Sequence, residues 1–147
     1  MPPPVGRPVF AALTAGLCLG ATVLGADIRD DGSGLAIELN AVSEAPRGCH
    51  LTFQIWNATP ADIDRLVYEG AFFTKAGELS RLALIDFGDI PAEARRIRRL
   101  TAPGLECGAL GRVFFADASI CETAGAARQA CSARPRLTSR TDVEVQG

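Results

Sequence analysis

The stretch CHLTFQIWNATPADIDRLVYEGAFF, residues 49–73, contains two candidate β-strands joined by a polar connection. In its first half apolar and polar residues alternate, so a strand would carry the apolar residues on one face. Those residues are Cys49, Leu51, Phe53 and Ile55. Asn57 and Pro60 end this strand, because asparagine favours turns and proline cannot donate to a sheet ladder. Residues 66–73 predict a second strand, and since a lone pair of strands is marginal in water, further strands must complete it.

The rest of the chain continues the strand pattern. Runs of alternating or branched residues, separated by glycine and proline, occur at 35–42, 79–87, 95–101, 111–117 and 136–145. Residues 122–130 predict a helical turn between the last two runs. Seven short strands in a chain of 147 residues predict one domain over residues 35–147, an all-β, seven-stranded antiparallel immunoglobulin-like β-sandwich. A small barrel is the main alternative.

The first 26 residues have the features of a secretory signal peptide. Arg7 supplies a positive charge, an uncharged apolar centre runs from Val9 to Leu24, and small residues around Ala26 suit cleavage. An uncleaved N-terminal anchor is the alternative. Residues 27–34 are polar and predict a flexible leader. We therefore expect a periplasmic or secreted domain that has no membrane span after signal cleavage.

Four cysteines remain after the signal peptide. They are Cys49, Cys107, Cys121 and Cys131. An even number in an exported domain favours disulfides over a metal site, because zinc ligands usually occur as closely spaced pairs. If successive strands reverse direction, the first two cysteines lie at one end of the sandwich and the last two at the other. We therefore expect the disulfides Cys49–Cys107 and Cys121–Cys131.

The charge pattern argues against nucleic acid as a partner. The formal net charge is −2, whereas nucleic-acid binding requires a basic face. One basic run occurs, with Arg95, Arg96, Arg98 and Arg99 around Ile97. It is typical of a solvated edge strand whose charges discourage pairing with other sheets, and contact with an anionic surface is the alternative.

The sequence contains no recognisable catalytic, cofactor or metal motif. His50, the one histidine, lies on the polar side of its strand without an evident orienting partner, so we expect a solvated surface residue. Asp86 and Asp89 do not indicate a glycosidase pair, because Asp89 suits a turn. The glycosylation-like run N-A-T at 57–59 is interpreted as coincidence. We expect a non-catalytic protein, and an enzyme built from scattered Asp, Glu and Arg is the alternative.

Several motifs resemble known families. The run NATPADIDRLVYEGAFF at 57–73, with AGEL at 76–79 and DFGDIP at 86–91, resembles the bacterial FxLYD and related immunoglobulin-like modules. The fuller pattern, CHLTF through PGLECGALGRV to SRTDVE, is similar to a group of uncharacterised exported alphaproteobacterial proteins often labelled as Tat pathway signal sequence domain proteins. This resemblance covers most of residues 35–147. It implies an exported immunoglobulin-like domain, and it implies no activity and no site residues.

Alternation also predicts one binding surface. Glu69 and Arg112 mark the outer faces of their strands, which places Phe73 and Phe114 outside. The inward residues are then Leu66, Tyr68, Phe72, Val113 and Phe115. Strands three and six are neighbours in an immunoglobulin-like sandwich, so Phe73 and Phe114 should share a face. The alternative is that residues 122–135 or the last strand cover both rings.

Exposed aromatic pairs are typical anchors for partner proteins. We therefore expect a periplasmic binding or accessory module with an envelope protein as partner. A small periplasmic inhibitor or a chaperone-like factor is the alternative. Trp56 is a third outward aromatic candidate, although it ends its strand beside Pro60 and could simply pack on that turn.

Overall fold

The computed structural model describes Met1 and residues 34–123, 131 and 133–147. Apart from Met1 and Gly34, the expected signal peptide and leader lie outside these residues, and so does most of the expected helical turn at 122–130. The strands are β1 (Leu35–Ala45), β2 (Gly48–Asn57), β3 (Ile63–Thr74), β4 (Leu79–Ile90), β5 (Ala94–Pro103), β6 (Leu110–Thr123), β7 (Arg136–Ser139) and β8 (Glu144–Gln146), and a 3₁₀ turn, η1, covers Cys107–Ala109.

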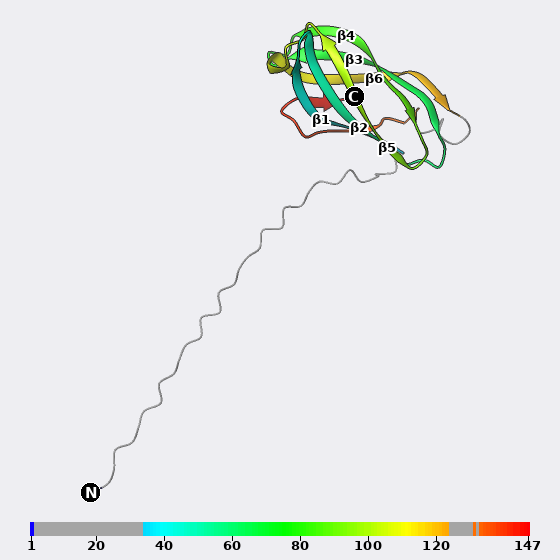
Figure 1. Cartoon of the computed structure of the whole chain (residues 1–147), viewed down its shortest axis with the longest axis horizontal. Helices are drawn as coiled ribbons and strands as arrows, with labels where there is room; N and C mark the ends of the chain where they lie inside the picture. The colour runs from blue at the N-terminus through cyan, green and yellow to red at the C-terminus, as the bar shows by residue number, and fades with distance from the viewer. Residues whose placement is uncertain (2–33, 124–130, 132) are drawn as a thin grey trace.

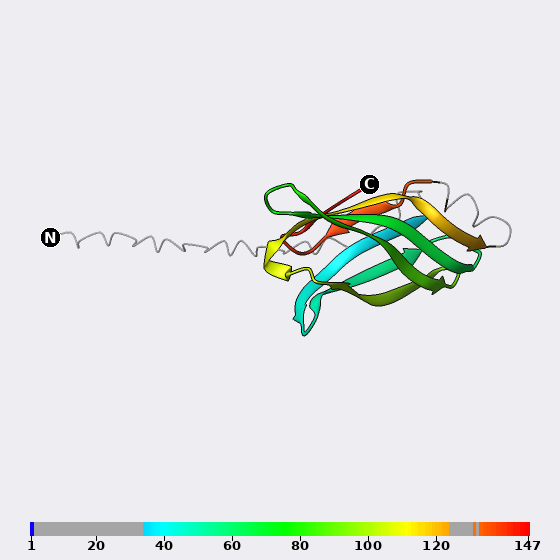
Figure 2. The ribbon, with the colours of Figure 1, turned by 90° about the horizontal axis from the view of Figure 1, so that it is seen from above.

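These strands form two sheets that pack face to face (Figures 1 and 2). Sheet A has the strand order β5-β2-β1-β7, and sheet B has the order β4-β3-β6-β8. In sheet A, β1, β2 and β5 correspond to strands A, B and E of an immunoglobulin sandwich. In sheet B, the neighbours β3 and β6 correspond to its strands C and F. The predicted all-β sandwich is confirmed, and the third and sixth strands are antiparallel neighbours as expected.

The prediction of a single last strand at 136–145 is wrong. The structure divides it into β7, which pairs in parallel with β1, and β8, which pairs in parallel with β6. The described residues therefore form eight strands rather than seven, and the sandwich is not wholly antiparallel. The break has a local cause, since the Ser139 hydroxyl accepts a hydrogen bond from the Thr141 N–H (3.1 Å), and the Thr141 hydroxyl accepts one from the Val143 N–H (3.1 Å). Such bonds compete with a sheet ladder.

An aromatic cluster fills the centre of the space between the sheets. Phe53 of sheet A lies edge-on to Phe87 and Phe115 of sheet B, with ring centroids 5.6 Å and 5.9 Å apart. Tyr68 lies edge-on to Phe115 at 5.6 Å. Each aromatic pair stabilises the fold by about 1 kcal/mol beyond the burial of its area. The predicted alternation in β2 is confirmed, because its apolar residues are buried and the residues between them are half-buried.

Asn57, fully buried at the end of β2, links three segments at one end of the sandwich. Its side-chain amide donates hydrogen bonds to the carbonyl oxygens of Ala61 (2.9 Å), Ile90 (3.2 Å) and Pro91 (3.2 Å). Its Oδ1 accepts hydrogen bonds from the N–H and the hydroxyl of Thr59, at 3.0 Å and 2.7 Å. The asparagine of the glycosylation-like run is therefore occupied inside the fold, where it holds the β2–β3 connection against the end of β4.

Both predicted disulfides are present. Cys49–Cys107 joins the start of β2 to η1, and Cys121–Cys131 joins the end of β6 to the segment that leads into β7. Because β6 runs from one end of the sandwich to the other, the two bonds lie at opposite ends, as the strand directions predicted.

We expect Asn57→Ala to lower the free energy of unfolding by about 2–4 kcal/mol, because it leaves three backbone carbonyls without their side-chain donor in a buried site. Equilibrium urea denaturation measures this. The exposed Ser80→Ala is the control, with an expected change below about 0.5 kcal/mol. Equal costs for the two variants would contradict the role assigned to Asn57.

The two disulfides should differ in their contribution to stability. They close sequence separations of 58 and 10 residues. In the chain-entropy model, replacing both cysteines of a bond by serine should cost about 4 kcal/mol for Cys49–Cys107 and about 3 kcal/mol for Cys121–Cys131. Denaturation of the two paired variants tests the order, and a larger cost for the second bond would contradict it.

Candidate functional site

The outer face of sheet B carries exposed apolar side chains on three neighbouring strands. Ala71 of β3 pairs with Leu82 of β4 on one side and with Phe114 of β6 on the other, so the three residues form a row across the sheet. Leu82 is 71% exposed, Leu84 is 66% exposed and Phe114 is 39% exposed. Soluble monomers rarely expose large apolar groups together, so this row marks a candidate interaction surface.

We call this surface the sheet B face. Its apolar members are Ala71, Phe73, Leu79, Leu82, Leu84 and Phe114. A hollow of about 340 Å³ lies on it, lined by residues of β4 and β6 and by the small Gly70 and Ala71 of β3. Gly70 is required by the inner packing, because a Cβ there would lie 2.4 Å from the Cδ1 of Ile85. The face is therefore low at Ala71 on the centre strand, and it is bounded along that strand by Glu69, which also lines the hollow, and by Phe73.

Charged residues lie on both sides of the row. Glu69, two residues before Ala71, pairs with Leu84 of β4. Phe73, two residues after Ala71, pairs with Arg112 of β6. The Arg112 guanidinium lies 4.5 Å from the centroid of the Phe73 ring, a cation–π contact. Glu69 therefore stands on one side of the row, and on the other side Arg112 lies between Phe73 and its β8 partner Glu144.

The structure places Phe73 and Phe114 on the same face of neighbouring strands, as the alternation predicted. Phe114 is exposed, whereas Phe73 is half-buried beside Arg112. The predicted inward residues of β3 and β6 are all buried. Val67 breaks the alternation, because the register shifts on both sides of it and it is buried although it lies in step with Glu69. Partner binding by the two phenylalanines stays a prediction.

The sequence reasoning missed Leu82 and Leu84, the two most exposed residues of the sheet B face. A signal for them was present, because in β4 the buried Ile85 and Phe87 share one face, and both leucines share the other face with the exposed Asp86. A run in which both faces are apolar resembles a fully buried strand. Asp86, which is charged and lies in step with the two leucines, is the residue that distinguishes a strand with one solvent-facing side from a fully buried strand.

Arginines cover part of the free edge of β4. Arg98 of β5 donates from Nε to the Phe87 carbonyl oxygen (2.7 Å) and from Nη2 to the Asp89 carbonyl oxygen (3.0 Å). Arg81 donates to the Pro103 carbonyl oxygen. β5 is an edge strand, as its arginine run predicted. Because backbone acceptors of the β4 edge are occupied, a partner would meet the face of sheet B rather than extend the sheet.

The other residues singled out from the sequence do not meet in a catalytic arrangement. His50 is half-exposed, and its Nδ1 lies 3.0 Å from the Thr101 hydroxyl. Asp86 accepts a hydrogen bond from Arg65 at 2.9 Å, and this bond lowers the pKa of the carboxyl group. Asp89 forms an ion pair with Arg98 at 3.1 Å. The two aspartates therefore serve separate surface ion pairs.

Trp56 lies on the outer side of sheet A, opposite the sheet B face. The Arg95 guanidinium lies 4.9 Å from its ring centroid, and the two residues are cross-strand partners. Trp56 does not join Phe73 and Phe114. Ile97 is the one large apolar residue of β5 that stays exposed, at 66%. It stands alone between arginines and is therefore not part of an apolar group.

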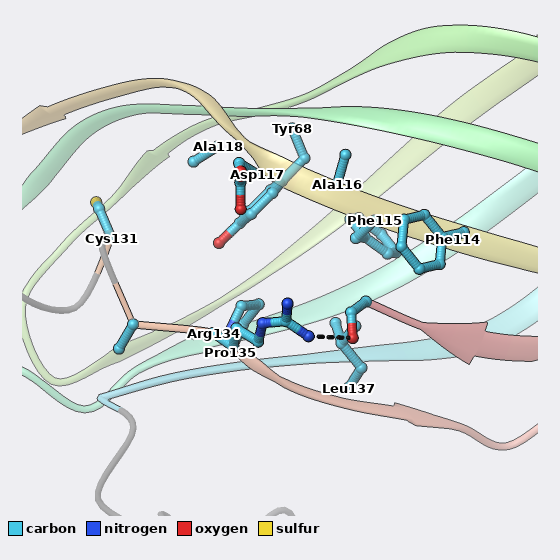
Figure 3. Close-up of a pocket in the computed structure, with 12 residues that line it drawn as sticks. Tyr68, Phe114, Phe115, Ala116, Asp117, Ala118, Cys131, Arg134, Pro135 and Leu137 are labelled. Atoms are coloured by element: carbon cyan, nitrogen blue, oxygen red, sulfur yellow. Dashed lines mark hydrogen bonds between the residues drawn. The ribbon is translucent and has the colours of Figure 1, made fainter.

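A cavity of about 450 Å³ lies between β6 and the segment that leads into β7 (Figure 3). The Tyr68 hydroxyl points from the core toward this space, and an Arg134–Gly147 hydrogen bond of 3.2 Å crosses its other side (Figure 3). Tyr68 is 2% exposed, and its hydroxyl has no hydrogen-bond partner in the described part of the chain. Burial raises the pKa of this phenol, so the group stays protonated.

Within the described residues, no three His, Cys, Asp or Glu side chains are grouped so that they could hold a metal ion. The same residues include no helix that is long and apolar enough to cross a bilayer. Comparison of the chain with protein-family models, with curated proteins and with solved structures found no match.

We expect Tyr68→Phe to raise the free energy of unfolding by about 1 kcal/mol, because it removes a buried hydroxyl that has no partner. Chemical denaturation of the variant against the wild type measures the change. A loss of stability of similar size would show that the hydroxyl is hydrogen-bonded in solution.

Proposed function

We propose that this protein is a non-catalytic, exported binding module that uses the sheet B face to dock on a protein surface. The observation that carries the proposal is the row formed by Leu82, Ala71 and Phe114, which is apolar across three strands and exposed on the outer two. Such a patch is costly in water and becomes favourable when a partner covers it. Docking as a small inhibitor or as a chaperone-like factor would use the same face.

Export to the periplasm is part of this proposal. It is supported by the apolar, signal-like residues 1–26 and by two disulfides, which persist in oxidising compartments. Disulfide-stabilised domains suit this setting, because the crosslinks maintain the fold outside the cytosol. The arrangement of Asp86, Asp89 and His50 in separate surface contacts supports a non-catalytic role.

Affinity capture from the native cell envelope tests the proposal. The full chain is compared with a Leu82→Glu plus Phe114→Ala variant, because truncated or charged anchors at the centre of an interface typically cost more than about 2 kcal/mol of binding. Recovery of a specific partner should fall at least about 30-fold for the variant. The matched control is Ile97→Glu, an exposed apolar residue on the opposite sheet, which should capture as well as the wild type.

Equal recovery of every partner by wild type, face variant and Ile97→Glu would overturn the assignment of the sheet B face. Thermal unfolding of all three proteins shows whether each is folded before capture. Both substituted residues of the face variant are exposed, so its melting temperature should remain close to that of the wild type.

A further inference from the structure

We infer that the sheet B face binds a second copy of this chain, related to the first by a two-fold axis that lies along the row Leu82–Ala71–Phe114. This inference rests on the proposed function, because it names the partner of the same surface. It follows from the way in which the two sides of the row complement each other.

The residues on the two sides lie at matching positions. Along β3, Glu69 and Phe73 each stand two residues from Ala71, about 7 Å on either side. On β4, Leu84 is the partner of Glu69, and Leu79 is the partner of Phe73. A two-fold axis in the plane of the face, along the row, therefore places the Glu69 side of one copy over the Phe73 side of the other.

This rotation places apolar residues over apolar residues, and it places the negative charge of Glu69 over the positive charge of Arg112. Leu84, 66% exposed, meets Leu79 of the second copy, 54% exposed. Glu69 meets Phe73 of the second copy, where the guanidinium of Arg112 lies against the ring. Each pair occurs twice, because a two-fold interface is self-complementary.

Glu69 and Arg112 are available for such a contact. Within the described part of the chain, neither residue takes part in an ion pair. They stand on opposite sides of the row and do not satisfy each other within one copy. A second copy brings Glu69 and Arg112 within reach of each other twice, and it adds a carboxylate to Arg112 beyond Glu144, the neighbour of Arg112 on β8.

The size of the face sets the strength of the association. β3 and β4 each have 12 residues. At about 3.3 Å per residue and about 4.8 Å between strands, the three strands present roughly 600 Å² per copy. Stable interfaces bury about 800 Å² per partner. We therefore expect a reversible dimer with a dissociation constant in the micromolar range, formed face to face because Arg98 occupies part of the β4 edge.

Sedimentation velocity of the exported form, from about 1 to about 300 µM, is the first test, because a micromolar dissociation constant lies within this range. Wild type and Ile97→Glu should shift from monomer to dimer as concentration rises. Leu82→Glu should stay monomeric throughout. A monomeric wild type at every concentration overturns the inference without any variant, and so does a Leu82→Glu protein that dimerises as the wild type does.

Charge exchange tests the axis. Glu69→Arg and Arg112→Glu should each weaken the dimer at least about tenfold, because each substitution turns two attractive pairs into repulsive ones. The double variant should dimerise at least about tenfold more tightly than either single variant, since the pairs between copies are restored with opposite sense. Recovery is incomplete, because a carboxylate at position 112 faces Glu144 and the cation–π contact with Phe73 is lost. If the single variants dimerise normally, or the double variant stays monomeric while folded by near-ultraviolet circular dichroism, the proposed axis is wrong.

The two proposals fail separately. A chain that remains monomeric but loses a captured envelope protein on Leu82→Glu substitution would overturn self-association and leave the docking function in place. A chain that neither dimerises nor depends on this face in any capture would overturn both.

Discussion

The packing of Phe53 against Phe87 and Phe115 is the contact on which the rest of the structure depends. It joins the two sheets at their centre, and it fixes which side of each strand is inside. Because side chains alternate along a strand, one buried ring determines the position of the residues two places away in either direction. Phe114 is outside because Phe115 is inside, and Leu84 is outside because Ile85 and Phe87 are inside. The exposed apolar row is therefore a consequence of the core.

The alternation of apolar and polar residues along each strand was sufficient to predict much of this architecture. In β2 the alternation is unbroken, and strand direction alone was enough to pair the four cysteines correctly. The pattern failed where side chains interfere with the ladder. The hydroxyls of Ser139 and Thr141 bind backbone N–H groups and divide the last strand, and register shifts around Val67 break its alternation. The register shifts depend on neighbouring strands, which a single sequence does not reveal, and the side-chain bonds of Ser139 and Thr141 leave no mark in the apolar alternation.

Only part of the sheet B face could be predicted from the sequence. Aromatic residues attract attention as binding anchors, so Phe73 and Phe114 were identified, whereas leucines on a strand are usually assigned to the core. In the structure the leucines are the more exposed residues, since Arg112 lies against Phe73 while Leu82 and Leu84 face the solvent. The cation–π contact could not be predicted without knowing that β3 and β6 pair in the register that sets Phe73 opposite Arg112.

The two crosslinks also determine how the domain would respond to a mechanical load. They close loops of 58 and 10 residues at opposite ends of the sandwich. Traction applied to the chain termini cannot lengthen the backbone inside these loops while the sulfur bridges remain intact. Most of β2 and all of β3, β4 and β5 therefore belong to an inextensible unit, and tension on the termini would first peel away the short strands β7 and β8.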